Sequence, residues 1–277
     1  MSIQVVDMSS PARAAAAKLS INAVSKRYGS LLDGVVALEP VDMAIADGDF
    51  VCIVGPSGCG KSTLLNIIAG FESPTSGAVM VAGNAINAPG PERGVVFQQG
   101  ALFNWMTVLD NVAFGPQALG WSAAQARETA MRHLDLVGLA SFAHRYPYEL
   151  SGGMQQRVAI ARALANEPEV LLMDEPFAAL DHQTRELLQE EIHRIWKGTG
   201  KTIVWITHSI DEALYLATHI VVMSARPGRV KAAFQTTFGD SADPFISTTP
   251  EFVEAKRQIV ALLREESIEA QRQEAMK

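Results

Sequence analysis

The chain has 277 residues, of which 48% are hydrophobic and 19% charged, and its formal net charge is −7. This length can bury a large core, so we expect one sizeable α/β domain, alone or with a smaller appendage. No basic block is longer than a pair of residues, and this acidic balance argues against nucleic acid as a partner.

The N-terminal region predicts a tail followed by antiparallel strands. Residues 1–18 contain neither a basic leader nor a long apolar stretch, which is typical of a flexible N-terminal tail and not of a secretion signal. Residues 19–29 (LSINAVSKRYG) and 35–50 (VVALEPVDMAIADGDF) alternate apolar and polar side chains, the pattern of strands joined by turns. We therefore expect an antiparallel β subdomain here.

Three apolar runs predict the strands of a central sheet. They are residues 49–55 (DFVCIVG), 168–176 (PEVLLMDEP) and 201–209 (KTIVWITHS), and a plausible helix follows each of them. Because continuous apolar strands are usually covered on both faces, we expect these strands to be central and parallel. Their alternation with helices predicts a doubly wound α/β sheet.

The remaining segments predict a helical insertion and a C-terminal extension. Residues from about 104 to 165 contain no comparable apolar strand and show helical patterns. The runs HIVVMSA and GRVKAAF predict a hairpin, turned at RPG, that closes the sheet, so we expect the main domain to cover residues 19–240. Residues 241–277 predict a loop and an amphipathic helix.

Hydropathy and cysteine usage point to a reducing, aqueous environment. All apolar runs are far shorter than the roughly 18–20 residues that span a bilayer. The two cysteines, Cys52 and Cys59, have no metal-ligand spacing and fit a reducing compartment. The sequence therefore predicts a chain that is soluble by itself, with the cytosol as its default location.

The most informative motif is a phosphate-binding loop at residues 55–63. GPSGCGKST satisfies GxxxxGK[ST] directly after an apolar strand and before a helix, the context that the motif requires. Glycines let backbone N–H groups surround phosphate oxygens, Lys61 adds a charge near the β and γ groups, and Ser62 would give its hydroxyl to Mg²⁺. The alternative is a glycine-rich turn without a ligand. The residues expected to bind nucleotide are Gly55, Pro56, Ser57, Gly58, Cys59, Gly60, Lys61, Ser62 and Thr63.

Two carboxylates end the second apolar strand. Asp174 suits Mg²⁺ binding through water, and Glu175 could accept a proton from an attacking water molecule. An Asp-Glu pair at a strand end is common in proteins of any function. The catalytic interpretation therefore depends on the phosphate-binding loop upstream.

Three further residues end predicted strands. His208 ends the third apolar strand, and a lone histidine is usually structural. In a parallel sheet, however, this position points it at the γ-phosphate, because ligands bind outside the carboxyl ends of such strands. Gln98, after RGVVF, could bind the attacking water or Mg²⁺ through its amide. Tyr28 could stack on a base, although an aromatic residue before a glycine is more often only a strand end.

The segment LSGGMQQR (150–157) predicts a second anion-binding helix start. Glycine pairs are costly inside helices, so we expect Gly152 and Gly153 to lie just before a helix, with Ser151 as its N-cap. Backbone N–H groups at such a start attract anions. A separate helical insertion is too remote to fold back onto the same phosphates. Two copies arranged head to tail would let each LSGGM cover the γ-phosphate held by the other chain.

Over roughly residues 19–235, the chain resembles the ATP-binding subunit of an ABC (ATP-binding cassette) transporter. The resemblance rests on the order and spacing of GPSGCGKST, Gln98, LSGGMQQR, VLLMDEP, AALD and ITHS. LSGGQ is the signature of that superfamily, and Met154 stands where the glutamine is. The resemblance implies a P-loop NTPase of the ABC ATPase type, with a mixed sheet core, an N-terminal antiparallel β subdomain and a helical insertion. It also implies ATP and Mg²⁺ as ligands and a homodimer of ATPase subunits.

The resemblance assigns roles to single residues. In its terms, Tyr28 stacks on adenine, Gly55–Thr63 cradle the phosphates, and Gln98 links Mg²⁺ to the transporter interface. Ser151 and Gly153 contact ATP in trans, and Asp181 lies at the dimer contact. Glu175 is the general base and His208 holds the γ-phosphate.

A single cassette without a membrane segment is typical of importers assembled from separate subunits. GPERGVVFQ, SARPGRV and a short tail look similar to the nitrate/sulfonate/taurine branch. Taurine or another alkanesulfonate is the first expectation for the solute, and nitrate or a small heterocycle is the next. The partners implied are membrane-spanning permease subunits and, indirectly, a solute-binding protein, with the chain peripheral at the cytoplasmic face of the inner membrane. Apolar residues after Gln98 would line the groove for the permease, namely Phe103, Trp105 and Met106, although core packing is at least as common a role for any one of them. Asn104 stands where relatives often carry proline.

Two other classes compete with this interpretation. A soluble ABC ATPase acting in translation usually has two cassettes and a basic surface, and one acting in DNA repair separates the two motifs by a long coiled coil. Here Leu150 follows Lys61 by only 89 positions. A nucleotide or metabolite kinase could share the phosphate-binding loop but has no use for LSGGM.

Overall fold

The computed structural model describes residues 1–30, 33–98, 101–178, 180–241 and 245–275. The chain divides into two compact units, which we describe separately. Unit 1 comprises residues 1–90 and 202–277, and unit 2 comprises residues 91–201.

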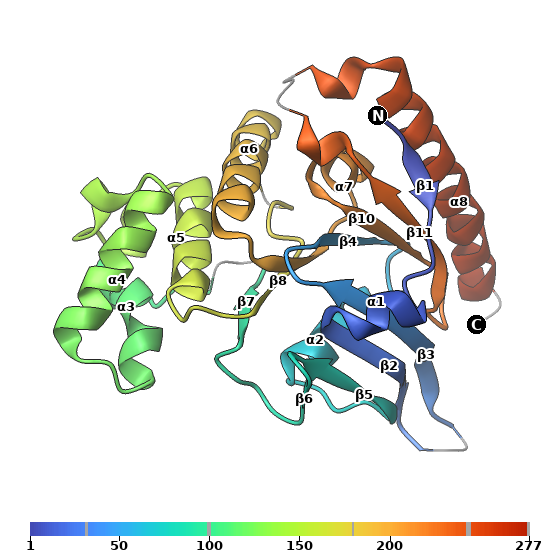
Figure 1. Ribbon diagram of the computed structural model, residues 1–277, viewed down its shortest axis with the longest axis horizontal. Helices are drawn as coiled ribbons and strands as arrows, with labels where there is room; N and C mark the ends of the chain where they lie inside the picture. The colour runs from blue at the N-terminus through green and yellow to red at the C-terminus, as the bar shows by residue number, and fades with distance from the viewer. Residues whose placement is uncertain (31–32, 99–100, 179, 242–244, 276–277) are drawn as a thin grey trace. The chain divides into compact units, whose positions relative to one another are not determined.

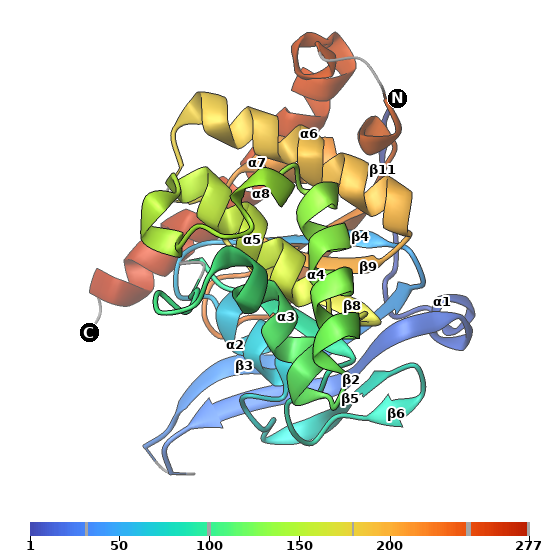
Figure 2. The ribbon, with the colours of Figure 1, turned by 90° about the vertical axis from the view of Figure 1, so that its left-hand side faces the viewer.

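The central sheet of unit 1 has the strand order β1-β11-β10-β4-β9. Figure 1 labels β1, β11, β10 and β4, and Figure 2 labels β9. The strands are β1 (Ile3–Val5), β4 (Phe50–Val54), β9 (Thr202–Ile206), β10 (His219–Met223) and β11 (Val230–Thr236). β10, β4 and β9 are parallel neighbours, and every residue in these three strands is buried. The prediction of central, parallel strands is confirmed for β4 and β9, and β10 is a further parallel strand of this sheet. β10 and β11 form the predicted antiparallel hairpin.

A second, antiparallel sheet completes the β structure of unit 1. Its order is β3-β2-β5-β6, built from β2 (Ala17–Tyr28), β3 (Val35–Ala46), β5 (Ser76–Val81) and β6 (Asn84–Ala85). Alternation along β2 and β3 leaves side chains such as Leu19, Ile21 and Ile45 fully buried. The predicted antiparallel β subdomain is therefore present.

The helices of unit 1 follow its strands. They are α1 (Pro11–Ala15), α2 (Lys61–Ala69), α7 (Ile210–Leu216) and α8 (Pro250–Ala275), with short 3₁₀ turns η3 (Phe238–Asp240) and η4 (Ile246–Thr248). Residues Phe252, Ala255 and Ile259 of α8 are buried, and Phe252 meets the ring of Phe238 edge to face at 5.2 Å. The predicted C-terminal helix is thus fastened to the sheet unit by one apolar stripe.

The first 18 residues differ from the flexible tail that we expected. β1 pairs with β11, and Arg13 of α1 donates to Asp49 Oδ2 at 2.7 Å and to His219 Nε2 at 2.9 Å. Because an arginine can only donate, the His219 ring accepts at Nε2 and carries its proton at Nδ1. Burial lowers the pKa of His219, which favours this neutral ring. Backbone pairing and one arginine therefore hold this segment in place. Neither leaves an apolar pattern in the sequence from which an ordered segment could be predicted.

Unit 2 combines two strands with a group of helices. β7 (Arg93–Val96) and β8 (Val170–Asp174) are parallel. The helices are α3 (Val108–Ala118), α4 (Ala123–Leu136), α5 (Gly152–Leu164) and α6 (His182–Thr199), with the turns η1 (Ala140–Phe142) and η2 (Pro147–Glu149). α3, α4 and α5 lie side by side (Figure 2). No strand occurs between 104 and 165 in the part of the chain that the structure describes, so the predicted run of helices is confirmed.

Two sequence signals set helix starts in unit 2. Ser122 and Gln125 form a capping box at α4, and Thr107 caps α3 by accepting from Asp110 N at 3.1 Å.

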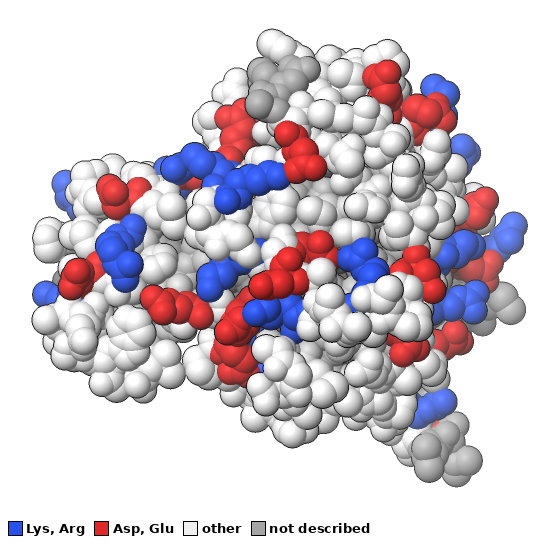
Figure 3. Space-filling view, in the orientation of Figure 1, with Lys and Arg blue, Asp and Glu red and all other residues white. Residues whose placement is uncertain are grey.

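Among the described helices, none combines the length and the apolar character needed to cross a membrane. On the face shown in Figure 3, acidic and basic side chains are interspersed.

Candidate functional site

The phosphate-binding loop lies between β4 and α2, in the strand–loop–helix context that its motif predicts. Gly60 has a φ of 105° and caps α2, and a Cβ built on it would lie 2.6 Å from Leu38 Cδ2, so only glycine fits this turn. The side chain of Lys61 is buried, and its Nζ donates to the carbonyl oxygens of Gly55 and Pro56 at 2.9 Å each. Ser57 and Gly58 at the tip of the loop are exposed. The loop is therefore curled around its own lysine, with its tip facing solvent.

Cys59 is enclosed within this loop. It is 1% exposed, and its Sγ lies 3.9 Å from Lys61 Nζ and 2.9 Å from a Cβ built on Gly55. Burial raises the pKa of the Cys59 thiol, opposed by the charge of Lys61. Since only the thiolate attacks alkylating reagents, this thiol is protected both by enclosure and by its protonation.

We expect alkylation of Cys59 to be at least about tenfold slower in the folded chain than in the urea-unfolded chain. The modified thiol has no room in the loop, so labelled molecules should lose nucleotide binding, and ATP should slow the labelling further. Timed labelling with iodoacetamide and mass spectrometry of the Cys59 peptide measures this, with the buried Cys52 as an internal control. Labelling of Cys59 at equal rates in both states would contradict the enclosure.

The strand register of unit 1 places His208 beside the phosphate-binding loop. β4 and β9 are parallel, and Ile53 pairs with Ile206. Two residues beyond this pair come Gly55 and His208, so both lie at the carboxyl edge of adjacent strands. His208 is exposed there. This edge is where parallel sheets bind their ligands.

Unit 2 has an equivalent strand edge with the predicted carboxylates. β7 and β8 are parallel, and Val96 pairs with Met173. Two residues beyond this pair come Gln98, which is exposed, and Glu175, which is half-buried. Glu175 has a φ of 46°, a left-handed conformation that costs a non-glycine residue on the order of 1–3 kcal/mol. The surrounding structure therefore holds this carboxylate in a strained position at the strand end.

The predicted helix start at LSGGM is present, with one difference. The side chain of Ser151 accepts from Met154 N at 3.3 Å and caps α5. Gly152 and Gly153 do not precede the helix as expected but form its first two residues. A Cβ on Gly153 would lie 2.7 Å from Thr184 Cγ2 of α6, so close helix packing explains why glycine stands within the first turn.

Asp181 lies next to this helix start. It caps α6 by accepting from Thr184 N at 3.0 Å and from Thr184 Oγ1 at 2.7 Å, and these hydrogen bonds lower its pKa. Gly153 contacts the same threonine, and a Cβ on Gly152 would lie 3.7 Å from Leu180. The structure thus brings Ser151, Gly152, Gly153 and Asp181 together at the N-termini of two packed helices.

Tyr28 occupies the end of β2, as expected. The residue is 43% exposed, and Lys26 Nζ lies 5.0 Å from the ring centroid. The same Nζ is ion-paired with Glu72, which offsets the charge of Lys26 beside the ring.

Taken one by one, the predicted metal ligands have side chains whose chemistry suits Mg²⁺. Ser62 presents an exposed hydroxyl in the first turn of α2, Gln98 an exposed amide, and Asp174 a half-buried carboxylate at the end of β8. Mg²⁺ keeps several waters and is usually held by one or two carboxylates with substrate phosphates. Among the described residues there is no group of three His, Cys, Asp or Glu residues that would form a complete protein cage.

Apolar side chains after Gln98 form an exposed aromatic surface in unit 2. Trp105 is 76% exposed and lies 5.4 Å from the ring of Phe103, which also meets Phe114 at 4.9 Å. Met106 is half-buried and Asn104 exposed. Fully buried Asn111 holds this loop by accepting from Phe103 N at 2.8 Å and donating to the Phe103, Met106 and Thr107 carbonyls.

Comparison with known proteins places the chain among transport ATPases. The family described as "ABC transporter" matches residues 38–178. An uncharacterized ABC transporter ATP-binding protein of Methanocaldococcus jannaschii is 46% identical over 253 residues, covering 91% of this chain and 94% of the relative. The taurine import ATP-binding protein TauB of Roseobacter denitrificans is 52% identical over 224 residues, covering 80% and 83%.

Solved structures agree with this family. A dimeric ATP-binding cassette in a post-hydrolysis state, bound to ADP and Pi, has a TM-score of 0.68 and 36% identity, covering 79% of this chain and 99% of its own. The ABC transporter component cbiO1 from Clostridium perfringens has a TM-score of 0.72 and 28% identity, covering 86% and 92%.

Proposed function

The chain belongs to the ABC transporter family as an ATP-hydrolysing subunit, and we propose that it powers the import of taurine or a related alkanesulfonate. The observation that carries the site assignment is the strand register, which sets His208 beside the phosphate-binding loop in one unit and Gln98 beside Glu175 in the other. Membership of the family implies ATP hydrolysis, and the residues at these strand ends have side chains suited to that reaction. The import function of named relatives favours this over a cassette ATPase of translation or DNA repair.

We propose that ATP is bound by Tyr28 and the residues of the phosphate-binding loop, Gly55 to Thr63. Tyr28 stacks on the base, the loop N–H groups bind phosphate oxygens, and Lys61 turns from its carbonyl partners to the β and γ groups. Ser62, Gln98 and Asp174 would hold Mg²⁺. When bound, this ion supplies positive charge that offsets charge on the phosphate oxygens.

Hydrolysis needs a water molecule to attack the γ-phosphate and give up a proton. Glu175 is the proposed general base that accepts this proton, and the Gln98 amide orients the water. His208 holds the γ-phosphate by a hydrogen bond. The strained backbone at Glu175 is consistent with this role, because such strain persists where the surroundings fix a side chain for function.

A second protomer is proposed to complete each site. The N-terminus of α5 at Ser151, Gly152 and Gly153 presents backbone N–H groups that attract anions, and Asp181 lies beside it. In a head-to-tail homodimer, this helix start would cover the γ-phosphate held by the other copy. ATP would draw the two copies together and hydrolysis would release them, which supplies the two states that transport requires.

The proposed membrane partners are permease subunits, with a solute-binding protein acting through them. The exposed ring of Trp105, with Phe103 and Met106, offers an apolar surface whose loop is fixed by the buried Asn111. An aromatic surface on a rigid support is suited to receive a short helix of a partner. The chain would then be peripheral, at the cytoplasmic face of the inner membrane.

We expect taurine to stimulate ATP hydrolysis several-fold when the chain is reconstituted with its co-purifying permease and binding protein in proteoliposomes. The measurement is phosphate release with taurine, another alkanesulfonate or nitrate as the added solute. A complex of the Glu175→Gln variant serves as the control for contaminating ATPases. Stimulation by nitrate alone would contradict the solute assignment, and absence of ATP hydrolysis with every solute would contradict the function.

A further inference from the structure

The turn at residues 224–229, between β10 and β11, is pressed against the phosphate-binding loop. A Cβ built on Gly228 would lie 1.9 Å from the carbonyl oxygen of Cys59, so the two backbones touch. Gly228 N donates to Ala37 O at 2.9 Å, and Gly228 O accepts from Glu39 N at 2.9 Å. The position of this turn relative to the loop is therefore fixed by backbone contacts on two sides.

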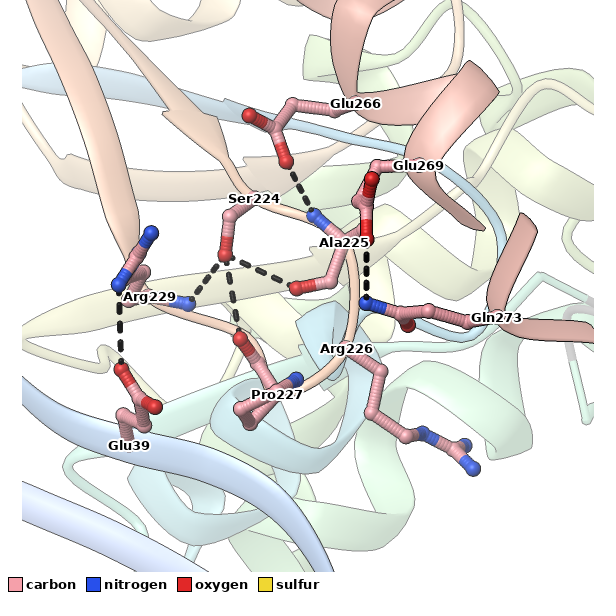
Figure 4. Close-up of a pocket in the computed structure, with 9 residues that line it drawn as sticks. All are labelled: Glu39, Ser224, Ala225, Arg226, Pro227, Arg229, Glu266, Glu269 and Gln273. Carbon is pink, nitrogen blue, oxygen red and sulfur yellow. Dashed lines mark hydrogen bonds and ion pairs between the residues drawn. The ribbon is translucent and has the colours of Figure 1, made fainter. Parts of the chain in front are cut away.

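The same turn is fastened internally and by the C-terminal helix (Figure 4). Ser224 Oγ accepts from Arg229 N and donates to Pro227 O, both at 3.1 Å. Glu266 of α8 is 8% exposed, and its carboxylate accepts from Ala225 N at 2.8 Å. Lys231 Nζ lies 2.8 Å from the same carboxylate, and this pairing helps to lower the pKa of Glu266 against the effect of its burial. A buried charged hydrogen bond thus ties α8 to the turn.

The side chain of Arg226 takes no part in the hydrogen bonds that fasten this turn. Its Nη2 would lie 3.8 Å from a Cβ on Gly58, at the exposed tip of the phosphate-binding loop. Its guanidinium makes no hydrogen bond or ion pair with any residue that the structure describes, and it points away from Glu266 and Glu269, which line a cavity of about 270 Å³ behind the turn (Figure 4). Arg229, three residues on, instead pairs with Glu39 at 3.6 Å. One arginine of the turn is paired, and the other faces the phosphate-binding loop.

We propose that Arg226 is a second cation of the nucleotide site, and that Glu266 is the positioning residue that holds it there. A guanidinium is always charged and offers a planar set of donors that suits phosphate oxygens. Lys61 supplies charge from inside the loop, whereas Arg226 supplies it from outside, across the exposed tip at Gly58. This inference rests on the proposed function, because the loop must hold a nucleotide for Arg226 to act on it.

The test compares nucleotide affinity of the isolated monomer in matched variants. We expect Arg226→Gln to weaken binding of a fluorescent ATP analogue about threefold to tenfold, the range for a partly exposed ionic contact. Arg226→Lys should restore part of the loss, and added salt should reduce the difference. Arg229→Gln removes the same charge from the same turn without touching the loop, and it should leave the affinity unchanged.

The positioning role has its own variants. Glu266→Ala removes the acceptor for Ala225 N and should reduce affinity as Arg226→Gln does, whereas Glu266→Gln keeps an acceptor oxygen and should restore it. Thermal unfolding of each variant separates this effect from a loss of folded protein. Equal affinities of Glu266→Ala and Glu266→Gln would contradict the role of Glu266.

Other outcomes separate the inference from the proposed function. Wild-type affinity in Arg226→Gln would overturn the inference, and so would normal monomer binding with impaired ATP-dependent dimerisation, because Arg226 would then face a second copy of the chain. Failure of the wild-type chain to bind ATP would instead contradict the proposed function.

Discussion

We expect Glu175→Gln to lower ATP hydrolysis about 10²- to 10⁴-fold while ATP affinity stays within the wild-type range. The reason is that the amide has nearly the shape of the carboxylate but cannot accept a proton from the attacking water. Glu175 also lies outside the phosphate-binding loop, so the contacts proposed to bind the nucleotide remain. ATP-bound dimers that cannot hydrolyse their nucleotide should accumulate.

Phosphate release, equilibrium ATP binding and size-exclusion chromatography with ATP measure these three properties. Glu190→Gln provides a matched control, since it makes the same change on an exposed position of α6. Turnover at the wild-type rate in Glu175→Gln would refute its role as base. A loss of ATP affinity would show that the carboxylate serves binding.

We expect Ser151→Arg to abolish hydrolysis while isolated monomers keep their affinity for ATP. Ser151 caps α5 beside Asp181, and a long cationic side chain there would obstruct the helix start that is proposed to cover the partner's γ-phosphate. Loss of the cap itself costs only about 1 kcal/mol of stability. ATP hydrolysis should therefore be lost because the shared site cannot close, while the chain itself remains folded.

Two controls isolate this effect. Ser151→Ala removes the cap without adding bulk, and Ser122→Arg makes the same change at the capping serine of α4. Both should retain most of the hydrolysis, measured as phosphate release at saturating ATP and high protein concentration. Weakened ATP binding by Ser151→Arg monomers would show that the serine contacts nucleotide bound to its own chain.

The predictable parts of this fold are those with a strong local signal. The run Phe50–Val54 is apolar throughout and ends at the glycine-rich loop, so both the buried strand and the loop that follows it could be inferred. Strand order and register could not be inferred, because pairs such as Val96 with Met173 depend on segments 77 positions apart. The register is nevertheless what sets Gln98 beside Glu175.

The parts that sequence reasoning missed depend on contacts without a sequence pattern. Arg13 contacts His219 across 206 positions of the chain, and no sequence pattern near either residue predicts the contact. The motif RPG signals only a turn, so the approach of Arg226 to Gly58 required the folded chain. Gly152 and Gly153 were expected before the helix because glycine weakens helices, and the close approach of Thr184 outweighs that preference.

The pairing of β1 with β11 has a practical consequence for handling this protein. β1 provides backbone partners along Phe234–Thr236, at what would otherwise be the open margin of the sheet. Removing the first few residues would leave the backbone amides and carbonyls along this edge of β11 unpaired. Strands of other molecules could then pair with them. Purification tags and truncations at this end therefore carry a risk of aggregation.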